Sequence, residues 1–395
     1  SALAAELSTA PLWKVLAPIC TIVFIEFLTM GLPLPVLPVH VSGTLGFGSF
    51  VVGLAIGIQS WATLLSRHGA GSWSDQRGPR GATVLGLALS ALAGATYALS
   101  HAISTPSASL AVLLLGRTVL GIGESLVVTG ALSWGLALAG RARSGAVMSW
   151  VGIAMYGALA TGAPLGSLLH ARFGFAGLSV AAALAPLTAL GIVFIARTVP
   201  AAGGVRMPFF RVIALLWLPG VGLMLSALGF GAIAAFSTLR FAQEGWPHAA
   251  FAMSAFGAAY VLARLLFGGL PDRYGGARLA MASAAVAALG QFGMWLAPSA
   301  AVAVAAAAMT GFGFSLAFPS FGIEAMRQVP PQNRGVALGA YTACFDATMG
   351  IGVPLLGVVA GGSGYGATFA VSACTAVAAL LVAALLWFRS KRDAR

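Results

Sequence analysis

The sequence predicts an all-α integral membrane protein with twelve transmembrane helices arranged in two pseudo-symmetric six-helix bundles. Three observations carry this prediction. The 395 residues are 59% hydrophobic and 8% charged, with a mean hydropathy of +0.96, whereas soluble proteins are about 25% charged. The apolar runs are about 20 residues long, as membrane-spanning helices require, and lack the short alternating segments of a β-barrel. A charged motif also recurs half a chain length apart.

The apolar runs define twelve spans, separated by short loops that contain Gly, Pro or Arg. Of the Lys and Arg residues, sixteen lie in loops and tails on one side of these spans, two (Arg172 and Arg240) on the other, and three within or at the ends of spans. Because positively charged loops stay in the cytoplasm, we expect both termini to be cytoplasmic. The spans lie near 15–39, 50–73, 82–103, 109–138, 145–169, 175–197, 214–240, 249–270, 278–297, 300–323, 337–361 and 367–388.

The recurring motif starts at Arg67 and again at Arg264, which are 197 residues apart, as are Asp75 and Asp272. A repeat at half the chain length predicts a duplicated architecture. No part of the chain is long and polar enough for a soluble ATP-hydrolysing domain, and no phosphate-binding GxxxxGK[ST] loop occurs. We therefore expect an N-terminal bundle over 1–199, a cytoplasmic linker over 200–212, and a C-terminal bundle with a short basic tail over 213–395.

Charged residues near the middle of spans are the first candidates for chemistry. Glu26, Glu124 and Asp346 are the three deep acids among nine carboxylates, and Arg117 is the one clearly intramembrane arginine. Such residues cost about 2.5–3.5 kcal/mol on insertion scales, face a cavity or a partner, and often carry protons. Glu26 and Asp346 are the leading candidates for proton or substrate binding, followed by Arg117 with Glu124. The alternative is that neutral acids, or a static Arg117–Glu124 pair, simply hold helices together.

These four residues have no charged mate 197 positions away in the other half. Glu324 lies only three residues beyond the position that this shift assigns to Glu124, so a small change of register would pair the two acids. The positions that the shift assigns to Glu26, Arg117, Glu124 and Asp346 are Leu223, Phe314, Phe321 and Ser149.

Other polar residues inside spans could line a cavity. The three cysteines (Cys20, Cys344 and Cys374) lie in apolar runs, and we interpret them as small core residues. The five histidines are scattered at loops and helix ends. We expect no metal site, no cofactor and no enzymatic activity, with a proton gradient as the energy source. The net charge of +12 is confined to loops, which argues against nucleic-acid binding. The candidate cavity residues are Gln59, Tyr156, Tyr260, Gln291 and Tyr341.

Together these motifs resemble the major facilitator superfamily. Gly71, Asp75, Gly78 and Arg80, following Arg67, match its loop 2–3 signature, and the second copy contains Arg264, Gly268, Asp272 and Arg278. The Arg117–Gly123 stretch resembles the fourth-helix motif of drug–proton antiporters. Gly157, Gly162, Pro164 and Gly166 resemble their fifth-helix motif, with Ala163 where a glycine usually precedes the proline. The whole chain is similar to a bacterial branch labelled arabinose-efflux-permease-like.

The resemblance implies a monomeric transporter of the bacterial inner membrane, in which two bundles rock around a central site. Asp75 would latch the cytoplasmic gate in the outward-open state. We expect proton-coupled efflux (antiport) of a small molecule. Three deep acids against one deep arginine favour a neutral or cationic substrate. The alternatives are a proton-coupled importer of a sugar or metabolite, and a non-transporting membrane receptor or scaffold.

Overall fold

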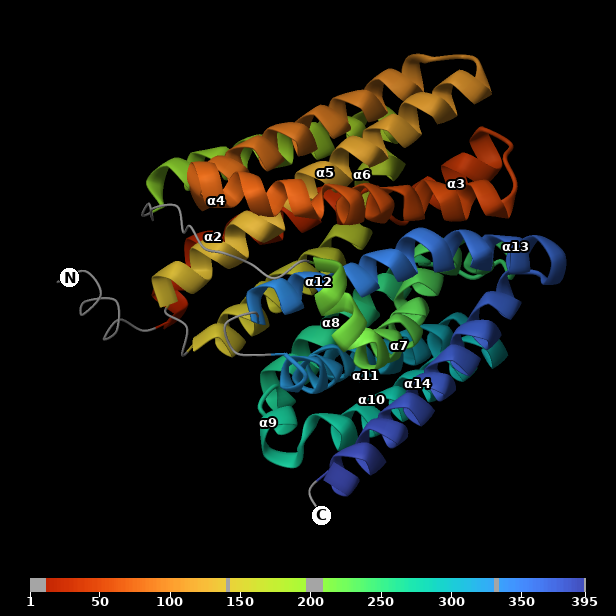
Figure 1. Cartoon of the computed structure of the whole chain (residues 1–395). Coiled ribbons are helices and arrows are strands. Elements are labelled where there is room, and N and C mark those ends of the chain that lie inside the picture. The colour runs from red at the N-terminus through yellow and green to blue at the C-terminus, as the bar shows by residue number, and fades with distance from the viewer. Residues whose placement is uncertain (1–11, 140–142, 197–208, 330–333, 394–395) are drawn as a thin grey trace. The chain divides into compact units, whose positions relative to one another are not determined.

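The computed structural model describes residues 12–139, 143–196, 209–329 and 334–393, and these ranges are helical and contain no strand (Figure 1). Short turns and π-helical segments interrupt the α-helices. The elements are α2 (Leu12–Gly31), α3 (Leu37–Val39), the π-helix η1 (His40–Thr44), α4 (Ser49–Ala102), α5 (Pro106–Ala139), α6 (Ser144–Ile195), α7 (Phe209–Gln243), α8 (Ala250–Phe267), α9 (Leu270–Tyr274), α10 (Gly276–Leu296), α11 (Ala300–Arg327), α12 (Arg334–Ala347), the π-helix η4 (Thr348–Gly352), α13 (Val353–Ser363) and α14 (Tyr365–Asp393).

Eleven segments of the described chain are long and apolar enough to cross a membrane. One of them, Ala146–Ile195, is 50 residues long and turns at Gly174, where φ is 64°. It therefore contains two spans, which brings the number to twelve. The predicted fold class is confirmed. The predicted linker over 200–212 lies largely outside the described residues, and α7 begins at Phe209.

Left-handed glycines mark the same three turns in each half of the described chain. A left-handed conformation costs other L-residues about 1–2 kcal/mol, so glycine suits these tight turns. The pairs are Gly46 and Gly245 (φ 75° and 67°), Gly78 and Gly275 (82° and 86°), and Gly174 and Gly364 (64° and 82°). They are a backbone trace of the duplication that the repeat predicted.

The chain forms two compact units whose boundaries differ from the predicted division in one respect. Residues 35–60 group with the C-terminal half, so the first unit ends at Leu34 and resumes at Trp61. The reason is close backbone packing within the second unit. A Cβ atom at Gly53 would lie 2.6 Å from the carbonyl oxygen of Val353, and one at Gly57 would lie 2.8 Å from that of Met349.

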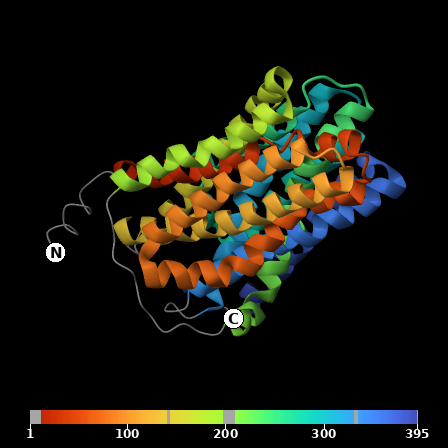
Figure 2. The same ribbon diagram turned by 90° about the horizontal axis from the view of Figure 1, so that it is seen from above.

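Within each unit, pairs of long helices pack closely. In the first, α2 lies along α6 (Figure 2) and also packs against α5. In the second, α10 packs against both α11 and α14, while α8 contacts α11 and α7 contacts α14. Small residues at these crossings allow the backbones to approach, as is typical of membrane helices.

The packing of α5 and α11 corrects the predicted register between the two halves. A Cβ atom at Gly123 would lie 2.8 Å from Gly86 O, and one at Gly313 would lie 2.6 Å from Ser283 O. Gly86 and Ser283 are 197 residues apart, but Gly123 and Gly313 are only 190 apart. The hairpin of the first half is therefore longer by seven residues, or about two helical turns.

This register pairs the sequence Gly121-Ile-Gly123-Glu124-Ser125 with Gly311-Phe-Gly313-Phe314-Ser315. The structural mate of Glu124 is thus Phe314, not Phe321, and that of Arg117 is Ala307. Glu324 corresponds to Trp134, so the suspected pairing of Glu324 with Glu124 is wrong. The deep charges of α5 have apolar mates in α11.

Candidate functional site

Glu26 and Ser90 form the centre of a polar cluster in the first unit. Glu26 lies in α2 and is 1% exposed, while Ser90 lies in the second half of α4 and is fully buried. The Ser90 hydroxyl oxygen lies 2.6 Å from Oε1 of Glu26 and 3.1 Å from the carbonyl oxygen of Gly86. The other carboxyl oxygen of Glu26, Oε2, has no hydrogen-bond partner among the described residues.

This geometry accommodates Glu26 in both protonation states. A serine hydroxyl has one proton to donate and two lone pairs that can accept. When Glu26 is ionised, Ser90 donates to its carboxylate. When Glu26 is protonated, the acid can donate to Ser90, which then donates to Gly86 O. A buried acid whose partner can reverse its role suits reversible proton binding.

Glycines of α4 and α5 make room for this arrangement. A Cβ atom at Gly123 would lie 2.6 Å from the Ser90 hydroxyl oxygen, and one at Gly86 would lie 2.7 Å from Gly123 O. Both distances are shorter than side chains tolerate, so the two backbones approach because neither position has a side chain. The glycines thereby hold Ser90 against Glu26.

Glu124 is the second acid of the cluster. Thr63, in α4, is buried, and its hydroxyl oxygen lies 3.0 Å from Gly121 O and 3.4 Å from Oε2 of Glu124. Glu124 is half-buried and close enough to Glu26 for the two carboxylates to repel each other when both are ionised. The structure therefore brings together two of the three predicted deep acids.

Arg117 lies on the same face of α5, about 10 Å along the helix axis from Glu124. It is 1% exposed, and its guanidinium lies near the hydroxyl group of Tyr97, which sits in α4. We call Glu26, Thr63, Ser90, Arg117 and Glu124 the acidic cluster. Ser90, Thr63 and Tyr97 were not predicted, because single hydroxyl groups in membrane helices give no distinctive sequence signal.

Asp346, the third deep acid, belongs to the second unit and is 4% exposed. It lies at the end of α12, directly before the π-helical turn Thr348–Gly352. Single π-helical turns inside α-helices occur frequently at functional sites. Asp346 therefore stays a candidate.

The predicted cavity residues are all buried, and the three in the C-terminal half form hydrogen bonds within or between helices. Tyr341 donates to Phe318 O (2.6 Å), and Tyr260 accepts a hydrogen bond from Arg264 (2.7 Å). Gln291 donates to the Thr310 hydroxyl (3.2 Å) and to Gly229 O (3.3 Å). Gln59 lies in the segment that groups with the second unit, and Tyr156 lies in α6. Their role in lining a cavity stays a prediction.

An aromatic cluster in the second unit occupies the position that corresponds to Glu124. Phe314 has ring centroids of four aromatic residues within 6.4 Å. This cluster was not predicted from the sequence. The signal was present, because the Gly-x-Gly-x-Ser patterns of the fourth and tenth spans match and place Phe314 where the first half has Glu124. The four neighbours are Phe230, Phe256, Tyr260 and Phe345. The two units thus differ in chemistry at equivalent places.

The repeated charged motif forms helix turns. Gly78 and Gly275 adopt the left-handed conformation at its two copies, while the side chains of Asp75 and Asp272 lie outside the described part of the structure. The guanidinium carbon of Arg80 lies 5.2 Å from the ring of Phe194. The helix α4 contains Arg67 and Gly71, and Gly268 directly follows α8. The guanidinium carbon of Arg278 lies 5.9 Å from the ring centre of Trp387. The gating role of these residues stays a prediction.

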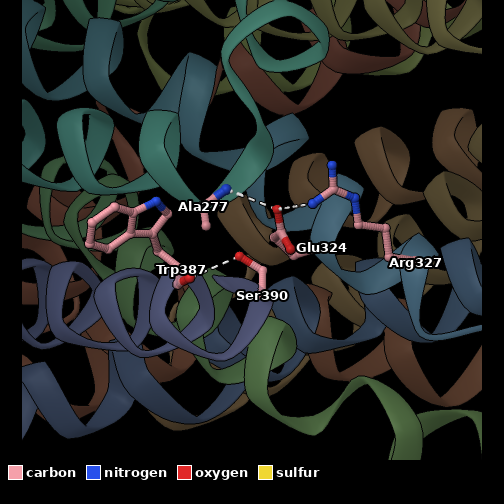
Figure 3. Close-up of polar contacts among 5 residues, drawn as sticks. All are labelled: Ala277, Glu324, Arg327, Trp387 and Ser390. Atoms are coloured by element: carbon pink, nitrogen blue, oxygen red, sulfur yellow. Dashed lines mark hydrogen bonds and ion pairs between the residues drawn. The ribbon is translucent and has the colours of Figure 1, made fainter. Parts of the chain in front are cut away.

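Glu324 supports the second copy of this motif. Its Oε1 accepts hydrogen bonds from the backbone N–H of Ala277 (2.9 Å) and from Arg327 (3.1 Å) (Figure 3). Ala277 is in the first turn of α10, where backbone N–H groups lack intrahelical partners. Glu324 therefore caps a helix that begins at the left-handed turn of Gly275.

The predicted fifth-helix motif packs against the end of α2. A Cβ atom at Gly162 would lie 3.0 Å from the carbonyl carbon of Gly31, and Gly166 faces Leu32 O. Pro164 lies between them, and Gly157 one turn before, in the same helix α6. These small residues let α6 contact the backbone of α2 where that helix stops.

The family model of the Major Facilitator Superfamily matches residues 19–241 and 219–395. The chain belongs to the major facilitator superfamily. An uncharacterised MFS-type transporter of Salmonella typhimurium is 42% identical to this facilitator over 365 residues, which are 92% of this chain and 94% of the relative. An uncharacterised MFS-type transporter of Burkholderia mallei is 44% identical over 375 residues, or 93% and 91% of the two chains.

Solved structures share the fold of this facilitator. The nucleoside transporter NupG has a TM-score of 0.75 and 16% identity, covering 94% of this chain and 99% of that one. FucP, in its outward conformation, has a TM-score of 0.66 and 14% identity, covering 94% and 98%. The facilitator is a multi-pass membrane protein and a secondary transporter.

Proposed function

We propose that this facilitator exports a small neutral or cationic molecule in exchange for protons, and that Glu26 carries the proton. The single observation that supports this most is the buried Glu26–Ser90 contact of 2.6 Å, whose direction can reverse with protonation. A fixed structural acid needs only one state, whereas a coupling acid must be stable in two.

Coupling requires only that the proton and the substrate compete for one site or one conformation. An ionised Glu26 beside Glu124 attracts a cation or a hydrogen-bond donor of the substrate. Protonation of Glu26 removes that attraction and releases the substrate. Asp346, in the second unit, is the second candidate for the same role.

Export, rather than import, is supported by the resemblance of Gly157, Gly162, Pro164 and Gly166 to the fifth-helix motif of drug–proton antiporters. Gly162 and Gly166 pack against Gly31 and Leu32, at the end of the helix that carries Glu26. A close contact at this point ties the position of α2 to that of α6. We propose that the protein acts as a monomer in the bacterial inner membrane with both termini cytoplasmic, as its distribution of Lys and Arg predicts.

The experiment uses everted membrane vesicles, which acidify internally during respiration. Ethidium serves as the cationic probe and uridine as the neutral one. For an exporter, internal acid drives a probe into the vesicles, nigericin abolishes this uptake, and Glu26→Gln and Asp346→Asn lose it at normal expression. Accumulation that requires external acid instead would establish an importer. Full pH-dependent transport by both neutral variants would refute the assignment of the proton sites.

A further inference from the structure

Arg240, in the last turn of α7, is a buried cation outside the acidic cluster. The residue is 6% exposed. Its Nη2 donates to the carbonyl oxygen of Trp295 at 2.9 Å, but Nε and Nη1 are buried without a hydrogen-bond partner among the described residues. Burying the N–H donors of a charged group without acceptors costs free energy. The buried Nη1 therefore indicates that an acceptor from outside the chain binds here.

The first turn of α14 faces this guanidinium. A Cβ atom at Gly366 would lie only 3.0 Å from Nη1 of Arg240, and Gly366 is the second residue of this 29-residue helix. The first N–H groups of a helix lack intrahelical partners, and the helix dipole makes this end positive. In α14 the N–H of Ala367 donates to Gly364 O at 3.2 Å, so the N–H groups of Tyr365 and Gly366 are the donors that an anion could use. Two positive groups that face each other repel, whereas an anion between them would accept hydrogen bonds from both.

Aromatic rings surround the same guanidinium. Its carbon atom lies 5.7 Å from the ring centre of Trp246 and 5.8 Å from that of Phe369. Phe369 is fully buried, Trp246 is half-buried, and the Gly366 position is 3.7 Å from the Trp295 ring. Glu244 acts on Arg240 electrostatically from one turn away but is exposed. The surroundings therefore suit an anionic group attached to an apolar body.

We propose that Arg240 and the N-terminus of α14 bind an oxyanion, a carboxylate or a phosphate group. The anion accepts hydrogen bonds from Nη1 and from the N–H groups of Tyr365 and Gly366, while Trp246 and Phe369 contact its apolar part. Its source is either a small soluble anion or the phosphodiester of a lipid. The site lies within the second unit and does not depend on the direction of transport or on the acidic cluster.

The test titrates the purified full chain in neutral detergent with benzoate and with inorganic phosphate at constant chloride. Tryptophan fluorescence, to which Trp246 and Trp295 contribute, and thermal unfolding report binding. We expect a saturable response that Arg240→Gln weakens about 10- to 100-fold, the loss of one charge-assisted hydrogen bond. Arg172→Gln, which removes an exposed arginine, is the matched control and should titrate like the wild type.

Gly366→Ala provides a second variant that keeps the charge. Its methyl group occupies the space in front of Nη1, so we expect the same weakening in a protein that retains Arg240. Nanodiscs of phosphatidylglycerol, compared with the neutral detergent, which contains no phosphodiester, distinguish the sources, because a bound lipid phosphodiester would compete with benzoate. The proposal is overturned if the wild type responds to none of benzoate, inorganic phosphate and phosphatidylglycerol. It is also overturned if the Gly366→Ala protein titrates like the wild type.

Discussion

The Ser90 hydroxyl oxygen lies between Oε1 of Glu26, at 2.6 Å, and the carbonyl oxygen of Gly86, at 3.1 Å. The hydroxyl can therefore donate its O–H either to Glu26 or to its own helix backbone as Glu26 loses or gains a proton. This relationship joins α2 to α4 at the deepest acid of the first unit. In the proposed function, it makes Ser90 a positioning residue for proton coupling.

Replacing Ser90 by Ala should weaken proton coupling without removing the acid. The variant leaves Oε1 of Glu26 without this partner, and a hydrogen bond to a charged group contributes about 1.5–3 kcal/mol. We expect proton-driven transport to fall about 10- to 100-fold, with Ser90→Thr retaining more activity than Ser90→Ala. Uptake of ethidium and uridine into everted vesicles over a range of pH measures this. A Ser90→Ala profile that superimposes on the wild type would show that the contact is only structural.

A methyl group at Gly123 should disturb both packing and transport. It would lie 2.6 Å from the Ser90 hydroxyl oxygen and 2.8 Å from Gly86 O, and such overpacking costs about 1–3 kcal/mol. Gly191→Ala is the matched control, because that helical glycine has no atom within 4 Å of the added Cβ and should become more stable by about 0.5–1 kcal/mol. Thermal unfolding in detergent compares the two variants. Equal midpoints would contradict the close packing of α4 and α5.

Truncating Phe314 should destabilise the second unit. Its ring contacts four other aromatic residues and is 1% exposed, so Phe314→Ala is expected to cost about 3–5 kcal/mol. Phe173, which is 65% exposed, provides the control, and its replacement by Ala should change stability by about 0.5 kcal/mol or less. The measurement is again the unfolding midpoint in detergent. A Phe314→Ala protein as stable as the wild type would mean that the aromatic cluster is loosely packed.

Removing the side chain of Glu324 should cost more than removing its arginine partner. Glu324→Ala leaves the Ala277 N–H without an acceptor at the start of α10, and loss of a helix cap costs about 0.5–2 kcal/mol. Arg327 has a 57% exposed side chain, so Arg327→Ala should cost about 0–1 kcal/mol. Urea titrations of the two variants decide between them. If both variants lose the same stability, the ion pair and not the cap is responsible.

Hydropathy predicted the spans well because it depends on local composition. The helix around Glu26 shows the limit of such reasoning. The apolar run was expected to continue to residue 39, but α2 ends at Gly31 and the chain resumes as α3 at Leu37. Pro33 and Pro35 explain the difference, since each removes a backbone donor and ends a continuous helix.

The correspondence of the two halves needed the structure. The charged motif repeats at 197 residues, and this shift misplaced the mates of Arg117 and Glu124. The close approach of Gly123 to Gly86 and of Gly313 to Ser283 sets the shift for these helices at 190. An insertion of two helical turns leaves the hydrophobic pattern intact, which is why hydropathy does not reveal it.

By itself, the sequence determined the twelve-helix membrane fold, its duplication and the three deep acids, because length, hydropathy and charge act locally along the chain. The tertiary structure alone decided which acids meet. Glu26 and Glu124 are 98 residues apart, and their approach depends on how α2, α4 and α5 are rotated and how closely glycines let them pack. Helix rotation and crossing arise from contacts between helices, so the pairing of Glu26 with Ser90 became visible only once the helices were packed.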